Sequence, residues 1–261
     1  MVERCNPAAD ERRELWESLS VVEDWLSGGV HRRRASLDFE AAEARAKARA
    51  DIAAPRSGDS LEAIAEEVRA CRACRLCEKR KQAVPGQGPA SPLAMVVGEG
   101  PGAEEDASGL PFVGPAGQLL DKMLASIELS RESNCYIANV VKCRPPQNRD
   151  PSADEQEACL GYLRRQIALL KPAAILCAGR IAAGALLGST EGVGRLRGLW
   201  REFEGRPLLV TYHPSALLRD DSYKRPAWED LKKFRDKLQE LAPSPGTEPS
   251  SIGAAVPADA E

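Results

Sequence analysis

The sequence predicts an α/β protein, a three-layer α/β/α sandwich built around a central, mainly parallel sheet of four strands. Short apolar runs alternate along the chain with longer segments whose apolar residues recur at helical spacing. The apolar runs are nearly continuous, which is typical of strands buried on both faces of a parallel sheet. Because strands separated by helices pack as a sheet covered on both sides, the two patterns together indicate the sandwich.

Each element of this sandwich has its own signal in the chain. Four apolar runs are predicted to be the strands: 93–97, 136–141, 173–177 and 208–212. Helices are predicted at 61–70, 115–127, 153–170, 180–187 and 228–241. Pro115 suits the first turn of a helix, and Ser152 with Glu155 forms a capping box before the third helix. Ligands bind beyond the carboxyl ends of parallel strands, so residues that follow the strands are expected to share one pocket.

The chain is predicted to divide into three regions. Residues 1–60 read as a helical extension and a linker, because 10–27 shows helical spacing and 51–60 is rich in Pro, Gly and Ser. Residues 61–241 carry the alternating pattern and are expected to be the functional domain. Residues 242–261 are rich in Pro, Ser, Ala and Gly, a composition too poor in apolar side chains to fold, so we expect a disordered tail.

Composition and charge limit the classes of protein. Hydrophobic residues make up 43% and charged residues 29%, and the net charge of −3 argues against a large basic surface while allowing a local basic groove. The chain contains no run of about 18 apolar residues, so the sequence predicts no membrane span. The mixed charges of Met1–Leu15 do not form a secretory signal, so the cytosol is expected. The eight cysteines are therefore interpreted as metal ligands, core residues or reactive thiols, not disulfides.

The first predicted strand runs into the glycine-rich loop Gly98-Glu99-Gly100-Pro101-Gly102. Such a loop lets the backbone approach a ligand closely, although a simple tight turn would read the same way. A dinucleotide loop is disfavoured, because the third glycine of GxGxxG is absent and the acidic residues that follow would repel a pyrophosphate. Phe112 follows in a loop between glycines, which suits either the core or stacking on a planar base.

Polar residues at two further strand ends point to a ligand. Asn139 lies in an apolar strand, where its amide needs either backbone partners or a ligand. Its donor and acceptor match a base edge such as that of uracil. His213, one of two histidines, precedes a proline at a strand end, which favours a functional position over a structural one. Leu217 and Leu218 follow in a predicted surface loop, where leucines act as wedges between bases.

Four cysteines are spaced like ligands of a metal centre. Cys71 and Cys74 form a C-x2-C pair, and Cys143 and Cys159 form a second pair. Four thiolates suit zinc or an iron–sulfur cluster, and the spacing alone does not decide between them. Cys77 is a competing ligand, whereas Cys135 and Cys177 flank or lie in predicted strands and are interpreted as core residues.

These motifs occur in an order that resembles the family 4 uracil-DNA glycosylases of bacteria and archaea. The resemblance covers roughly residues 65–240 and leaves out the two termini. It is carried by C-R-A-C-R-L-C, V-V-G-E-G-P-G-A-E-E-D, G-L-P-F-V-G-P-A-G-Q-L-L, Y-I-A-N-V-V-K-C-R-P-P-Q-N-R-D-P and T-Y-H-P-S-A-L-L-R. Several motifs in one order are far more specific than any one of them.

The resemblance implies a cofactor and a base pocket. It implies a [4Fe–4S] cluster on Cys71, Cys74, Cys143 and Cys159. It implies that Phe112 stacks on uracil, that Asn139 reads its edge and that His213 hydrogen-bonds O2. Glu99 and Gly100 would line the pocket and position water. Gly102 occupies the place where another glycosylase family has a tyrosine that rejects thymine, so that device is missing here.

The resemblance also implies catalytic and DNA-binding residues. Glu105 and Asn148 match positions implicated in catalysis, together with Glu99 and His213. Leu217 or Leu218 would fill the gap left by the flipped base, and three arginines would hold nearby phosphates: Arg144, Arg149 and Arg219. The expected partner is uracil-containing DNA, single- or double-stranded, bound by a monomer.

The expected reaction is the hydrolysis of the bond between a flipped-out uracil and its deoxyribose. Two alternatives compete with it: a non-catalytic nucleic-acid binding module held by a metal, and an oxidoreductase with a nucleotide cofactor. A covalent-trapping relative also carries the cluster. It has a glutamine in the first motif and a basic insertion after the second strand, whereas this chain has Glu99-Gly100 and no insertion between Arg144 and Ser152. Turnover is therefore favoured over trapping.

Overall fold

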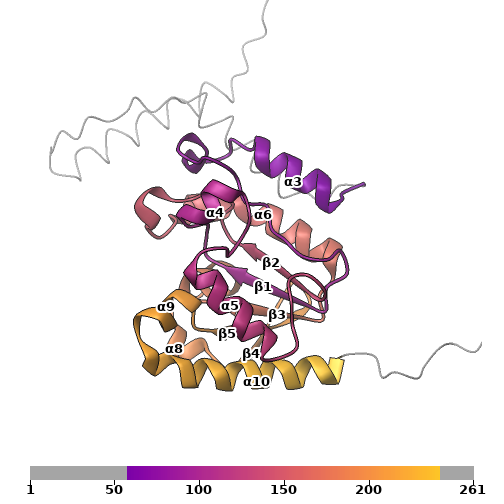
Figure 1. Cartoon of the computed structure of the whole chain (residues 1–261). Coiled ribbons are helices and arrows are strands. Elements are labelled where there is room, and N and C mark those ends of the chain that lie inside the picture. The colour runs from indigo at the N-terminus through magenta and orange to yellow at the C-terminus, as the bar shows by residue number, and fades with distance from the viewer. Residues whose placement is uncertain (1–57, 242–261) are drawn as a thin grey trace, which may run out of the picture.

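The computed structural model describes residues 58–241 and forms a central sheet with helices on both faces, as Figure 1 shows. The α/β class and the three layers predicted from the sequence are confirmed. The helical extension and nearly all of the linker predicted in 1–60, as well as the tail predicted at 242–261, lie outside the described residues. None of the helices within 58–241 is both long and apolar enough to cross a membrane.

The sheet contains the four predicted strands, each close to its expected bounds. They are β1 (Ala94–Gly98), β2 (Cys135–Asn139), β3 (Ala174–Ala178) and β5 (Arg206–Thr211). These four are parallel to their neighbours in the order β2-β1-β3-β5. Their apolar side chains are buried because both faces of the sheet are covered, which is why each strand reads as a continuous apolar run.

The predicted count of four strands was wrong, because the sheet has five strands. β4 (Trp200–Phe203) pairs antiparallel with β5 at the edge of the sheet. Its Arg201 and Glu202 are exposed, so it lacks the apolar run by which the other strands were found. The hairpin turns through Glu204 and Gly205, both with positive φ (50° and 71°), as a two-residue turn between antiparallel strands requires.

The five predicted helices are present, with small shifts at their ends. They are α3 (Leu61–Ala70), α5 (Pro115–Ala125), α6 (Ala153–Leu170), α7 (Arg180–Leu187) and α10 (Lys224–Leu241). The capping box before α6 is formed, since the Ser152 N–H donates to Glu155 Oε2 at 2.9 Å. Short helices were not predicted: α4 (Ala103–Ser108), α8 (Val193–Leu196), α9 (Pro214–Arg219) and the 3-10 turns η1 (Arg75–Glu78), η2 (Pro146–Asn148) and η3 (Asp221–Tyr223).

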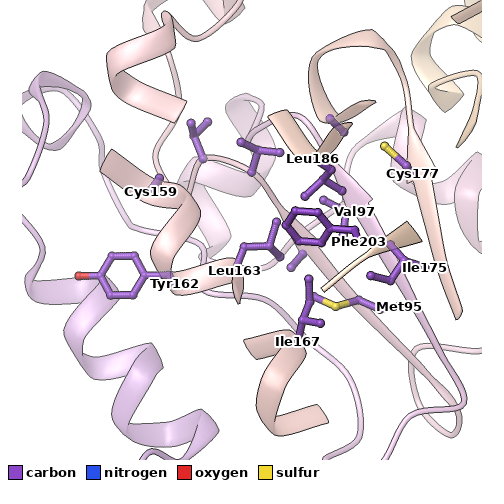
Figure 2. Close-up of a cluster of buried hydrophobic side chains, with 14 of the residues drawn as sticks. Met95, Val97, Cys159, Tyr162, Leu163, Ile167, Ile175, Cys177, Leu186 and Phe203 are labelled. Atoms are coloured by element: carbon purple, nitrogen blue, oxygen red, sulfur yellow. The ribbon is translucent and has the colours of Figure 1, made fainter. Parts of the chain in front are cut away.

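The core lies in two layers, one on each face of the sheet. Alternate residues of a strand face opposite sides, so Met95 and Val97 of β1 pack with α6, α7 and α3 while Val96 packs with α5 and α10. Figure 2 shows the first layer, where Leu163 and Ile167 of α6 meet strand residues. The interpretation of Cys135 and Cys177 as core residues is confirmed, since both are fully buried. Helices on both faces leave the carboxyl ends of the parallel strands for the loops described next.

Candidate active site

A cavity of about 530 Å³ opens at the carboxyl ends of the parallel strands. The register brings these ends together, because Gly98 of β1 pairs with Asn139 of β2 and Ala178 of β3 pairs with Thr211 of β5. Ten of the residues proposed from the sequence line it: Glu99, Gly100, Gly102, Glu105, Phe112, Asn139, Asn148, Arg149, His213 and Arg219. The expectation that the strand ends share one pocket is therefore confirmed.

The ring of Phe112 and the amide of Asn139 meet over Gly98. A Cβ added to Gly98 would lie 2.7 Å from Phe112 Cε2 and 2.5 Å from Asn139 Oδ1, so only glycine leaves room for both groups. Phe112 lies in a loop, as expected, and its side chain is buried. Its ring centroid is 5.5 Å from that of His213, with the two planes tilted by 31°. Ring, amide and imidazole thus surround one small space.

Asn139 presents an unused acceptor in this space. Its residue is 2% exposed, and its Oδ1 is the buried side-chain atom without a hydrogen-bond partner among the described residues. The backbone carbonyl of Asn139 is held separately by Lys142 Nζ at 3.0 Å. A buried acceptor without a partner destabilises the folded state by about 1–3 kcal/mol. A ligand N–H at this position would satisfy it.

His213 presents a neutral ring with its N–H on Nε2. The residue caps α9, and its Nδ1 accepts the Ser215 backbone N–H at 3.2 Å and lies 2.8 Å from Ser215 Oγ. Since a backbone N–H can only donate, Nδ1 is the acceptor and Nε2 carries the proton. Burial, helped by the charge of Arg219, lowers the pKa of His213 to about 4. The ring is therefore a neutral donor at physiological pH.

The two glutamates of the glycine-rich loop have different surroundings. Burial and the nearby Asp150 raise the pKa of Glu99 to about 7, although Arg180 and Arg219 oppose the shift. Glu105 instead has both oxygens engaged: Oε2 accepts the Gly102 N–H, and Oε1 accepts from the N–H groups of the loop that follows Phe112, each at 3.0 Å. Glu99 is therefore free to act on a ligand or water, whereas Glu105 holds the loop.

The three predicted DNA-binding arginines differ in whether they line the cavity and in the partners they already have. Arg219 lines the cavity mouth. Arg149 also lines it, but its guanidinium is paired with Glu155 at 2.7 Å. Arg144 does not line the cavity, and it donates to Asn148 Oδ1 at 2.8 Å. Arg144 therefore orients the amide of Asn148 from outside the cavity wall.

The two leucines predicted as wedges, Leu217 and Leu218, differ in exposure. The segment that follows His213 is the helix α9 and not the expected surface loop. Leu217 is 3% exposed and packs in the core, while Leu218 is 51% exposed. A wedge must reach between bases. Of the two leucines, Leu218 has the exposed side chain that this role requires.

The four predicted ligand cysteines gather in a second place, behind the carboxyl end of β2. Cys71, Cys74, Cys143 and Cys159 line one small cavity, together with Cys77. Their sulfurs accept hydrogen bonds, as thiolates bound to a metal do: Arg80 Nη1 lies 3.0 Å from Cys143 Sγ, the Lys142 N–H 3.3 Å from Cys159 Sγ and the Ala73 N–H 3.5 Å from Cys71 Sγ.

The charges around these sulfurs also suit an anionic group. The fully buried ammonium of Lys142 lies close enough to Cys143 and Cys159 to interact with both electrostatically. The donor set therefore fits a thiolate-bound centre. Within 58–241, however, no three histidine, cysteine, aspartate or glutamate side chains converge as the ligands of a single metal ion.

Sequence reasoning missed several residues of the site. Arg180 lies outside the motifs found in the sequence, whereas Tyr212 and Asp150 lie within them but were given no role. Arg180 and Tyr212 line the cavity, and Asp150 pairs with Arg180 at 2.5 Å. Gly98 was read only as part of a flexible loop, although a position at the end of a strand facing two functional side chains needs the smallest residue. The signal that could have found Arg180 and Tyr212 is their place just beyond strand ends: Tyr212 directly follows β5, and Arg180 follows β3 after one glycine.

Comparisons with known proteins identify the family of this chain. The family model described as the uracil DNA glycosylase superfamily matches residues 85–232. A type-4 uracil-DNA glycosylase of Saccharolobus solfataricus is 43% identical over 69% of this chain and 87% of its own length. One of Thermotoga maritima is 39% identical over 69% of this chain and 95% of its own. A type-5 uracil-DNA glycosylase of Pyrobaculum aerophilum is 34% identical over 51% of this chain and 66% of its own.

Proposed function

This chain belongs to the type-4 family of the uracil-DNA glycosylase superfamily, and on that premise we propose that it flips uracil out of DNA and hydrolyses its N-glycosidic bond. The product is an abasic site, the first intermediate of base excision repair. The observation that carries the proposal is the buried, unpartnered Oδ1 of Asn139, which lines one cavity together with the ring of Phe112 and the imidazole of His213.

The extracted base is held by one ring and one amide. Phe112 stacks on its face, and base–aromatic stacking contributes about 1–3 kcal/mol. Asn139 Oδ1 accepts the N3–H of uracil, and its Nδ2 donates to O4. Cytosine has an acceptor at N3 and an amino group at C4, so it would oppose both groups of this amide. The arrangement therefore selects uracil over the cytosine from which it arises.

Bond cleavage leaves negative charge on the base and positive character on the sugar. The Nε2–H of His213 donates to O2 and stabilises the departing uracil anion. A group that stabilises charge appearing in the transition state contributes about 10²- to 10³-fold in rate. Because the pKa of His213 is lowered to about 4 by burial, the ring acts as a neutral hydrogen-bond donor and does not transfer a full proton.

Glu99 is the carboxylate that acts on water in this proposal. When ionised, it orients the attacking water and favours the cationic sugar. Glu105 is a positioning residue, since three backbone N–H groups occupy its oxygens. Asn148, whose Oδ1 is taken by Arg144, offers its amide N–H groups to the water or the sugar phosphate.

DNA is bound around the cavity mouth. Arg219 and the partly neutralised Arg149 contact phosphates, and Arg144 acts through Asn148. Leu218 enters the stack where the uracil has left. Flipping costs a few kcal/mol and is easiest from single strands and mismatches, so these substrates should be cleaved fastest. We also propose that the protein acts as a monomer in the cytoplasm, where the DNA of a nucleoid would be its substrate.

The four cysteines would hold a [4Fe–4S] cluster: Cys71, Cys74, Cys143 and Cys159. When bound, the cluster supplies a structural cross-link and no chemistry at the base. Cys71 and Cys74 follow α3, Cys143 follows β2 and Cys159 lies on α6, so these residues would tie the amino-terminal segment to the loop that carries Asn148. Visible absorbance together with iron and sulfide content would distinguish the cluster from zinc.

The proposed function is tested with an end-labelled single-stranded oligonucleotide that carries one uracil, followed by alkali to break abasic sites. We expect strand breakage at the uracil, no breakage when cytosine takes its place, and free uracil among the products. A gel shift without breakage would indicate a binding module. The absence of both a gel shift and breakage would refute the proposal. His213→Ala provides the matched control for a contaminating glycosylase, because it should remove the activity of this chain alone.

A further inference from the structure

Phe112, the proposed stacking residue, has an unusual backbone. Its φ of 52° lies in the left-handed region, which residues other than glycine adopt rarely. Such a conformation persists only where the surroundings impose it. The loop that carries it contains glycines on either side, at 109 and 114, so local sequence does not impose it. The structure therefore needs another cause for the position of the ring.

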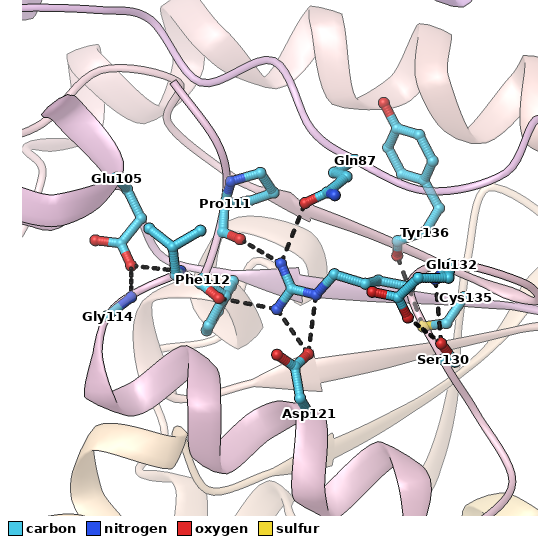
Figure 3. Close-up of polar contacts among 12 residues, drawn as sticks. Gln87, Glu105, Pro111, Phe112, Gly114, Asp121, Ser130, Glu132, Cys135 and Tyr136 are labelled. Carbon is cyan, nitrogen blue, oxygen red and sulfur yellow. Dashed lines mark hydrogen bonds and ion pairs between the residues drawn. The ribbon is translucent and has the colours of Figure 1, made fainter. Parts of the chain in front are cut away.

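Arg131, in the turn between α5 and β2, contacts this backbone directly. It is 8% exposed, and its guanidinium donates to the carbonyls of Pro111 and Phe112, each at 2.8 Å. Nε and Nη2 also donate to Asp121 Oδ1 at 2.9 and 2.7 Å, and Nη1 donates to Gln87 Oε1 at 3.2 Å. Figure 3 shows these partners around the guanidinium. All five N–H groups of the side chain are thus in use.

The loop is held from its other side as well. Glu105 accepts the N–H groups of Val113 and Gly114, which follow Phe112 directly (Figure 3). Gly117 of α5 lies against the Phe112 carbonyl so closely that an added Cβ would collide with it. The carbonyls before the turn and the amides after it are therefore fixed by two charged side chains of opposite sign.

We propose that Arg131 is a positioning residue that holds Phe112 in its left-handed conformation and so pre-forms the surface on which uracil stacks. The inference rests on the proposed function, since it assigns to Arg131 a role exercised only through the Phe112 ring. Two consecutive carbonyls and a carboxylate require a planar fork of donors. The single ammonium of lysine keeps the charge next to Asp121 but does not reproduce the fork.

Loss of the planar set of guanidinium donors should weaken substrate binding and leave the rate of bond cleavage nearly unchanged. The loop relaxes toward ordinary backbone conformations, and only a fraction of the molecules keeps the ring over Gly98. Apparent affinity falls in proportion to the competent fraction. If that fraction drops to about one tenth, KM rises about tenfold while kcat at saturation stays within about twofold. A general loss of folded protein would instead lower kcat.

The test is a double-mutant cycle of Arg131→Lys and Phe112→Ala on the full chain, with uracil release as the assay. Arg131→Lys alone should lower kcat/KM about tenfold through KM. Phe112→Ala alone should lower it roughly 10- to 100-fold. The double variant should match Phe112→Ala within about twofold, because Arg131 has no ring left to position. Losses that multiply in the double variant would overturn the proposal.

A second measurement does not depend on catalysis. Hydrogen exchange of the amides of Val113 and Gly114 should speed up in Arg131→Lys, and unchanged exchange would also overturn the proposal. Arg165→Lys is the matched control: Arg165 is another buried arginine, paired with Asp59 at 2.5 Å and Glu67 at 2.7 Å away from the cavity. It should leave both KM and this exchange unchanged. If the wild type releases no uracil, the proposed function fails while the exchange experiment still decides the role of Arg131.

Discussion

Replacing Gly98 by alanine tests the geometry of the base pocket with a single methyl group. The added Cβ would lie 2.5 Å from Asn139 Oδ1 and 2.4 Å from Phe112 Cζ, whereas ordinary contacts begin near 3.4 Å. The amide oxygen and the ring must therefore move by about 0.9 and 1.0 Å, respectively, if the backbone stays in place. A misplacement of about 1 Å costs on the order of 100-fold in rate, so kcat/KM for uracil release should fall by about that factor.

The assay is initial-rate release of uracil from a single-stranded oligonucleotide, normalised to folded protein. Overpacking of this kind also destabilises a protein by about 1–3 kcal/mol, so urea unfolding is measured in parallel. Gly192→Ala is the control, because Gly192 has ordinary φ and nothing within 4 Å of the added Cβ. An alanine at position 98 that keeps wild-type kcat/KM would refute the claim that Phe112 and Asn139 together form the pocket.

Four further outcomes follow from the same site. Asn139→Ala should lower kcat/KM by about 10²-fold without destabilising the protein, since it removes an unsatisfied acceptor; parallel rate and urea-unfolding measurements check this. Because burial raises the pKa of Glu99 to about 7, kcat should increase with pH between about 6 and 8, and this limb should vanish in Glu99→Gln. The pKa of His213 is lowered from 6.5 to about 4, so unfolding takes up a proton as the pH falls through this window. Between pH 6.5 and pH 4 the free energy of unfolding should therefore decrease by up to about 3 kcal/mol, and the decrease should be smaller in His213→Gln. Urea titrations at these two pH values measure it. Leu218→Ala should slow cleavage of duplex more than of single-stranded DNA, whereas Leu217→Ala should cost about 2–5 kcal/mol of stability; equal kinetic effects on both substrates would contradict the assignment of Leu218.

The elements that could be predicted from sequence are those with a long or continuous pattern. α6 and α10 repeat their apolar residues over several turns, and the parallel strands are buried on both faces. β4 was not predicted, because this edge strand buries few side chains and carries exposed charges. α4 and α9 are each six residues long, too short for a helical period to stand out. Their caps, Gly102 and His213, were singled out instead as functional residues.

Most residues that line the candidate site could be predicted from the sequence, but the role of each residue could not. Residues at strand ends converge because parallel strands end at one edge, which made Asn139 and His213 visible from the chain alone. The choice between Leu217 and Leu218 depends on the phase of α9, which two adjacent leucines do not reveal. The difference between Glu99 and Glu105 arises from backbone N–H groups whose positions only the folded loop defines. Arg131 lies in no motif, and its importance appears only through the carbonyls it contacts.

A crystal structure of the protein with bound uracil tests the central claim most directly. We expect the base stacked on Phe112, with Asn139 Oδ1 within about 3 Å of N3 and His213 Nε2 at hydrogen-bond distance from O2. A uracil bound elsewhere, or one whose N3 edge leaves Asn139 Oδ1 without a partner, would contradict the account.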